Sequence, residues 1–164
     1  MEMTLQELLS IAPFSWAAIT TALFCGGVIG LERQLRGKPV GIRTSTLITL
    51  GTYIFISAAN AAATDMTDPS RVIGQVITGI GFLGAGVMLA RDGVVVGVTS
   101  AATIWMLAAI GVSISIGHLG AAIKFSLIVV AILYGVEMLE ENTKSLSRGV
   151  HARLVARRTP PDQR

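Results

Sequence analysis

The chain has 164 residues, of which 52% are hydrophobic and only 14% are charged, with a mean hydropathy of +0.68 and a formal net charge of +3. Soluble domains are usually about 25% charged, so the long uncharged blocks exclude an ordinary soluble fold and indicate lipid as the solvent. The single cysteine, Cys25, excludes an internal disulfide and a multi-cysteine metal site. We therefore predict an integral membrane protein.

Five apolar blocks have about the length that a helix needs to cross the hydrocarbon core of a bilayer. Their predicted ranges are 13–31, 44–63, 72–90, 94–116 and 121–136. The predicted fold class is all-α: a polytopic transmembrane helical bundle formed by residues 1–136. Residues 137–164 are expected to form a separate basic tail.

Basic residues are distributed unevenly between the two sides of this arrangement. Of the thirteen Lys and Arg residues, all except Arg71 and Lys124 fall in the loop 32–43, the short link 91–93 or the tail. Because basic loops stay on the cytoplasmic side, we predict a cytoplasmic C-terminus and an N-terminus outside.

Glycines are concentrated in the first and third blocks. Gly79-x-Gly81-x-x-Gly84 matches a dinucleotide fingerprint on paper, but that motif needs a preceding strand and here it lies inside an apolar block. Small residues let helix backbones approach closely, and a broken helix lining a cavity is the alternative. The predicted helix-packing positions are Gly26, Gly30, Gly79, Gly81, Gly84 and Gly86.

Only Arg91-Asp92-Gly93 separates the third and fourth blocks, so these two are predicted to be antiparallel neighbours. We expect this helical hairpin to lie at the centre of the bundle, with the other helices packed against the glycines of the third helix.

Charged residues adjoin the membrane on the predicted cytoplasmic side, at Glu32, Arg33, Arg43, Arg91 and Asp92. They are interpreted either as ion pairs that fix helix register or as a vestibule that attracts a cation or a charged loop of a partner. Glu32 and Asp92 are weak candidate ligands for a divalent cation, because two carboxylates supply only part of an oxygen-ligand shell.

Hydroxyl groups recur in the fourth block at Thr99, Ser100 and Thr103. Such groups usually bond to carbonyls of their own helix, and a polar pathway through the membrane is the alternative. The sequence shows neither a nucleophile–base pair nor a Cys/His metal spacing, so we expect no enzymatic activity and no cofactor. Topology accounts for the basic residues, so we expect no nucleic-acid binding.

Three segments, GLERQLRGKPVGIRTSTLITLG (30–51), GQVITGIGFLGAGVMLARDG (74–93) and GVTSAATIWMLAAIGV (97–112), resemble in their order the MgtC/SapB family of bacterial inner-membrane proteins. The resemblance covers the first four blocks, without the soluble ACT-like domain of several members. It implies a multi-pass protein of the cytoplasmic membrane that is linked to magnesium homeostasis and modulates other membrane proteins. The matching motif positions are Glu32, Arg33, Gln34, Gly41, Arg43 and Thr44, then Gly79, Gly81, Phe82, Gly84, Ala85 and Gly86, then Gly97, Thr99, Ala101, Ala102 and Trp105.

The expected function is therefore a non-enzymatic membrane module that modulates ion or magnesium homeostasis. Its expected partners are the lipid bilayer and either further copies of itself, as a homo-oligomer, or other membrane proteins. Magnesium ion is a candidate ligand. The alternative is a transporter or channel for a divalent cation such as magnesium, with the third and fourth blocks as its pathway.

Overall fold

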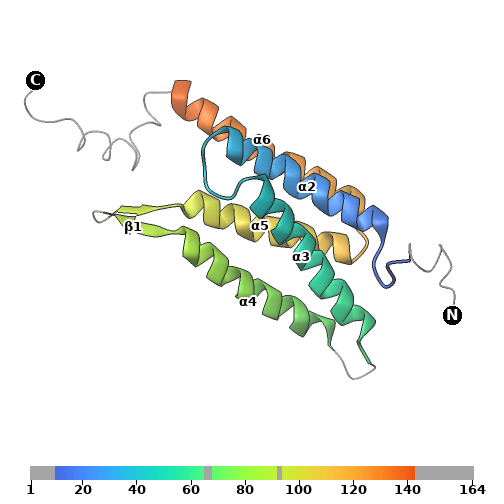
Figure 1. Ribbon diagram of the computed structural model, residues 1–164. Helices are drawn as coiled ribbons and strands as arrows, with labels where there is room; N and C mark the ends of the chain where they lie inside the picture. The colour runs from blue at the N-terminus through green and yellow to red at the C-terminus, as the bar shows by residue number, and fades with distance from the viewer. Residues whose placement is uncertain (1–9, 65–67, 92–93, 143–164) are drawn as a thin grey trace, which may run out of the picture.

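The computed structural model describes residues 10–64, 68–91 and 94–142, which form five helices and one short β-hairpin (Figure 1). The helices are α2 (Trp16–Leu35), α3 (Ile42–Ala61), α4 (Pro69–Val87), α5 (Val98–Ser115) and α6 (Leu119–Asn142). The strands β1 (Leu89–Arg91) and β2 (Val94–Val96) lie between α4 and α5. The all-α fold class is thus confirmed for the described residues, with the hairpin as an addition.

The helices begin and end at recognisable signals. Ser15 caps α2 by accepting a hydrogen bond from the Ala18 amide at 3.2 Å, and Asp68 caps α4 ahead of Pro69. The predicted first charged loop is shorter than expected, because α2 continues to Leu35 and carries Glu32 and Arg33 inside the helix. The expected boundary at residue 137 falls within α6.

The predicted charged link between the third and fourth helices is instead the β1–β2 hairpin. Arg91 pairs with Val94, and Leu89 pairs with Val96 in antiparallel register. The valines at 94–96 are apolar enough to extend a predicted helix, yet β-branched residues favour strands. Gly97 then turns the chain into α5 with a φ of 92°, a conformation that favours glycine.

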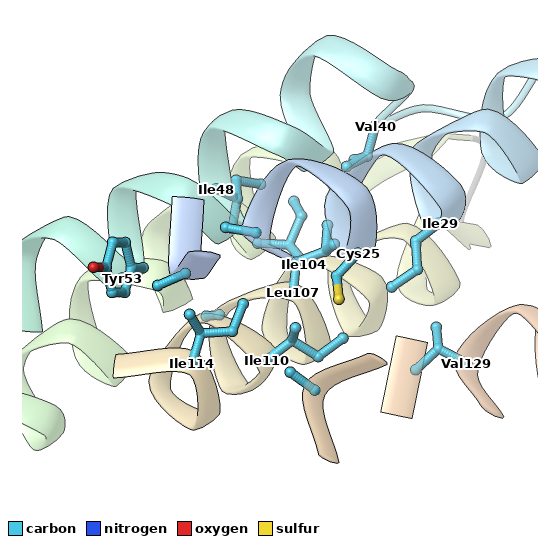
Figure 2. Packing of buried hydrophobic residues seen from close by; sticks show 14 residues of the cluster. Cys25, Ile29, Val40, Ile48, Tyr53, Ile104, Leu107, Ile110, Ile114 and Val129 are labelled. Atoms are coloured by element: carbon cyan, nitrogen blue, oxygen red, sulfur yellow. The ribbon is translucent and has the colours of Figure 1, made fainter. Parts of the chain in front are cut away.

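The packed centre of the bundle is formed by α2, α3, α5 and α6, with α4 on its outer side against α5 (Figure 1). Cys25 and Ile29 of α2 belong to the same buried cluster as Ile104, Leu107 and Ile110 of α5 (Figure 2). The prediction that α4 and α5 are antiparallel neighbours is confirmed. The prediction that this pair forms the centre is wrong, because only 6% of the residues in Ser70–Val87 are buried.

Gly26 and Gly30 confirm the predicted close packing, and the partner helix is α3. A Cβ atom added to Gly26 would lie 2.7 Å from Thr46 Cα, and one added to Gly30 would lie 2.5 Å from Ile42 Cα. Gly111 of α5, which the sequence did not single out, has the same role: its Cβ would lie 2.7 Å from the Thr49 carbonyl oxygen. Backbone therefore packs directly on backbone at these three glycines.

The glycines of α4 behave differently from the prediction. A Cβ atom added to Gly79, Gly81 or Gly86 would have nothing within 4 Å, and one added to Gly84 would make ordinary contact with Ala101 Cβ at 3.7 Å. The prediction that helices of the same chain pack tightly against these glycines is therefore wrong. The reason is the position of α4, which touches its own chain along one side and leaves the other side open.

Small polar groups are buried in this bundle beside its apolar core, while several large apolar side chains face outward, as α3 shows. Ser45 and Thr49 are fully buried and donate hydrogen bonds to the carbonyls of Val40 and Ser45 at 3.0 and 3.1 Å. By contrast, Leu47 and Phe55 are 63% and 70% exposed. Lipid favours this arrangement, since apolar side chains lose nothing by facing it and hydroxyls must be satisfied internally.

Of the described helices, three are long and apolar enough to cross a membrane: α4, α5 and α6. This character identifies a membrane protein. Polar residues lower the apolarity of α2 and α3, although the structure packs many of them inward. Successive helices alternate in direction, so α2 begins at the end of the bundle opposite to where α6 ends (Figure 1). The five crossings and their orientation stay predictions.

Candidate functional site

The candidate site lies at the end of the bundle where α2 and α6 end and where α3 and α5 begin, which we call the charged end. Five side chains form it: Glu32, Arg33 and Arg36 of α2, Lys38 of the following loop, and Glu137 of α6. We call these five residues the charged cluster. It joins the last turn of α2 to α5 and to α6.

Arg33 and Glu32 are the buried members of the cluster, at 4% and 8% exposure. Arg33 Nη2 donates a hydrogen bond of 2.9 Å to Ser100 Oγ in the first turn of α5, while Arg33 Nε has no hydrogen-bond partner. Glu32 Oε1 lies 3.0 Å from Arg36 Nε, as an ion pair whose geometry falls short of a hydrogen bond. Glu32 Oε2 has no partner among the described residues.

The outer members of the cluster tie the α2–α3 loop to α6. Glu137 Oε2 lies 2.6 Å from Arg36 Nη1, and Glu137 Oε1 lies 3.1 Å from Lys38 Nζ. The Arg36 guanidinium also lies over the ring of Tyr134, 4.8 Å from its centroid, which is the geometry of a cation–π contact. These groups are partly exposed, so each ion pair contributes about 1 kcal/mol or less.

The cluster differs in membership from the one predicted. The structure brings Glu32 and Arg33 together as expected, but Arg43 lies exposed on α3 and makes no ion pair with any described residue. The side chain of Arg91 and all of Asp92 lie outside the described part of the chain. Sequence reasoning left Arg36, Lys38 and Glu137 out of the site, although Arg36 stands four residues after Glu32, the spacing of a helical ion pair.

The metal prediction rested on Glu32 and Asp92. Asp92 is outside the described residues, and within them no group of three His, Cys, Asp or Glu side chains lies close enough to hold a metal ion. Glu32 itself faces Arg36 rather than a second carboxylate. The described side chains therefore offer an ion-paired carboxylate, which is at most one ligand for a hard cation.

Two of the three predicted hydroxyl groups of α5, those of Ser100 and Thr103, form hydrogen bonds within the bundle. Ser100 and Thr103 are 2% and 3% exposed, and Thr99 is exposed. Thr103 Oγ1 donates to the Thr99 carbonyl at 2.8 Å, and Ser100 Oγ accepts from Arg33. These bonds favour the structural interpretation of Ser100 and Thr103 over a polar pathway.

Two hollows lie outside the charged cluster. One, of about 460 Å³, is at the opposite end of the bundle and is bordered by Ser15, Tyr53, Ser57, Asn60 and Ser115. The other, of about 730 Å³, runs between α3 and α4 with Ile104 of α5 also lining it, and we call it the α3–α4 groove. Arg43 and Thr44 stand at its charged end, and most of its lining is apolar.

Known proteins resemble this chain across most of the described helices. The profile of the family described as "MgtC family" matches residues 19–142. The "Putative magnesium transporter YhiD" of Escherichia coli (strain K12) is 44% identical over 113 residues, covering 65% of this chain and 52% of that protein. "Protein MgtC" of Brucella abortus (strain 2308) is 37% identical over 116 residues, covering 71% and 48%. "Protein MgtC" of Salmonella typhimurium is 37% identical over 111 residues, covering 68% and 47%.

The chain thus spans about half the length of these curated relatives. No solved structure was found to match it.

Proposed function

Because this chain belongs to the MgtC family, we propose that it is a non-enzymatic membrane protein that modulates ion or magnesium homeostasis by associating with further copies of itself or with other membrane proteins. The observation that carries the proposal is the open face of α4. The charged cluster has a supporting structural role, because its hydrogen bonds and ion pairs link α2 to α5 and α6 at one end of the bundle.

The open face of α4 consists of small residues at helical spacing. Gly74, Thr78, Gly81 and Ala85 are separated by four, three and four positions, so they lie along one side of the helix, and all four are exposed. We call them the small-residue stripe. A Cβ atom added to Gly74 or Gly81 would meet nothing within 4 Å.

Such a stripe is suited to a second helix rather than to lipid alone. Association of helices in lipid depends on close van der Waals packing, and small residues permit it. The chain itself provides the comparison at Gly26 and Gly30, where an equivalent pair brings α2 and α3 into backbone contact. On α4 the corresponding partner is absent from the described part of the chain, and a second copy or another membrane protein would supply it.

Cation transport is the second candidate, and a specific observation keeps it open. A relative that is 44% identical is named a putative magnesium transporter. In this chain the unpartnered Glu32 Oε2 is the described group that would attract a cation at the charged end. Two of the α5 hydroxyls that a pathway would use, those of Ser100 and Thr103, are already bonded within the bundle.

Assembly of the full chain in lipid nanodiscs tests the proposal. The mass of the wild type is expected to correspond to two or more copies, and Gly81→Leu is expected to shift it to one copy because the larger side chain holds the helices apart. Gly86→Leu is the matched control, since Gly86 is exposed on the same helix but lies off the stripe. It is expected to assemble as the wild type does.

Liposomes loaded with a magnesium-sensitive dye separate the two candidates. A modulator gives no magnesium entry above that of empty liposomes. Entry that is abolished by Glu32→Gln would overturn the modulator proposal in favour of transport. A wild type that is a single copy in nanodiscs would overturn self-association.

A further inference from the structure

The α3–α4 groove is at least as long as one lipid leaflet is thick. Along α3 its lining runs from Arg43 to Phe55, about 18 Å at 1.5 Å per helical residue, and along α4 from Val72 to Val87, about 22 Å. One leaflet of the hydrocarbon core is about 15 Å thick, half of the 30 Å total. The groove therefore begins at the charged end and is long enough to hold the acyl chain of a lipid from that leaflet.

The groove is open because two glycines flank it. Gly51 of α3 and Gly79 of α4 both line it, and a Cβ atom added to either would meet nothing within 4 Å. Leu47, Ile80 and Leu83 are part of its apolar wall. The stripe residues of α4 are not part of this lining, so the groove and the small-residue stripe are different faces of α4.

The charged end of the groove is suited to an anion. The Arg43 side chain is exposed and, unlike those of Arg33, Arg36 and Lys38, has no ionic or hydrogen-bond partner among the described residues. It stands in the first turn of α3, near the positive end of the helix dipole. The N-cap Gly41 provides no side-chain cap, and Gln34 Oε1 accepts a hydrogen bond from the Ile42 amide at 3.3 Å, so this helix end is only partly covered. Guanidinium groups and helix N-termini both bind phosphate oxygens.

The shape and lining of the groove favour a slender apolar occupant with an anionic head. The groove is a long, mostly apolar hollow of about 730 Å³ between two helices, and the Arg43 side chain, unpaired among the described residues, stands at one end of it. We propose that it binds one acyl chain of an anionic phospholipid, whose phosphate is held by Arg43 at the N-terminus of α3. The second acyl chain stays in the bilayer.

The binding of a lipid here has a structural consequence. α4 packs on α5 and makes far less contact with α3, so an acyl chain in the groove would fill the space between α3 and α4. Lipid binding would thereby fix the position in which α4 presents its small-residue stripe. The inference does not rest on the proposed function, because groove and stripe involve different side chains.

Native mass spectrometry of the full chain with phosphatidylglycerol and phosphatidylcholine of identical acyl chains tests the inference. The wild type is expected to retain phosphatidylglycerol in preference to phosphatidylcholine. Arg43→Ala is expected to weaken phosphatidylglycerol binding about 10-fold, which corresponds to loss of one charge-assisted hydrogen bond. It is expected to weaken phosphatidylcholine binding less, because the choline cation of that lipid already neutralises its phosphate, so the preference for phosphatidylglycerol shrinks.

Gly79→Leu tests the acyl-chain part separately. Its side chain would occupy the groove, so it is expected to weaken the binding of both lipids about equally. The controls are Arg71→Ala, an exposed arginine in the first turns of α4, and Gly86→Leu, which lies off the groove. Both are expected to behave as the wild type. Equal retention of the two lipids by the wild type, or unchanged retention in Arg43→Ala and Gly79→Leu, would overturn the inference.

Discussion

Gly30→Ala measures how tightly α2 and α3 are packed. The added Cβ atom would lie 2.5 Å from Ile42 Cα, 2.8 Å from Ile42 N and 2.9 Å from Ser45 Cβ, whereas ordinary contact begins at 3.4 Å. Two of these three atoms belong to the backbone, so relief requires the helices to move apart by roughly an ångström. Overpacking of this kind costs about 1–3 kcal/mol.

A second effect of the substitution has the opposite sign. Replacing glycine by alanine inside a helix stabilises it by about 1 kcal/mol. Gly27→Ala isolates this term, because its Cβ would make only one ordinary contact, with Thr46 Cγ2 at 3.9 Å. The difference between the two variants therefore gives the packing cost alone, since the propensity gain is common to both.

The assay is reversible unfolding in mixed micelles by increasing denaturing detergent, followed by tryptophan fluorescence. Gly30→Ala is expected to be less stable than Gly27→Ala by about 1–3 kcal/mol. If the two variants unfold at the same detergent fraction, the close approach of α2 and α3 at Gly30 is refuted.

Three further predictions concern the charged cluster and the cap of α4. Arg33→Ala leaves Glu32 buried beside one fewer cation and is expected to destabilise the fold by about 3 kcal/mol, whereas Ser100→Ala is expected to cost about 1 kcal/mol, both measured by the same unfolding titration. Glu137→Gln removes two partly exposed ion pairs, so it is expected to cost about 1 kcal/mol at low salt and less at high salt. The hydrogen bond from Ser70 lowers the pKa of Asp68, so its contribution to stability is present above the unfolded-state pKa and is lost as the pH falls through the folded-state pKa. Asp68→Asn is expected to remove this acid-dependent loss, as seen in unfolding titrations repeated at acidic and neutral pH.

The succession of helices could be predicted from the sequence, because the apolar blocks match the five observed helices to within a few residues at most ends. Hydropathy alone mispredicts a helix boundary where a residue type favours both an apolar helix and a β-strand. Val94, Val95 and Val96 are apolar, which extended the predicted fourth span, and they are also β-branched, which the structure uses in β2. Similarly, Glu137 marked the start of a polar tail in the sequence, but its ion pairs keep it on α6.

Whether a glycine allows close helix packing depends on which neighbouring helix faces it. A single sequence does not contain that information. Gly30 and Gly81 both stand among small residues in apolar helices. Only Gly30 faces a neighbouring backbone, while Gly81 faces away from its own chain. The charged cluster was partly predictable for a related reason: Glu32 and Arg36 are close within one helix, whereas Ser100 and Glu137 reach the cluster only through tertiary packing.

The two proposals assign different faces of α4 to different neighbours, and this makes them separable. A variant on the stripe, Gly81→Leu, should change assembly and leave lipid retention unchanged, whereas Gly79→Leu in the groove should change lipid retention first. If each variant changes assembly and lipid retention equally, the substitution must shift the whole of α4 relative to the bundle. Its attachment through β1, β2 and Gly97 and its packing on α5 would then govern both. The stripe and the groove share no residue. If each variant changes only its own property, the two faces of α4 act independently.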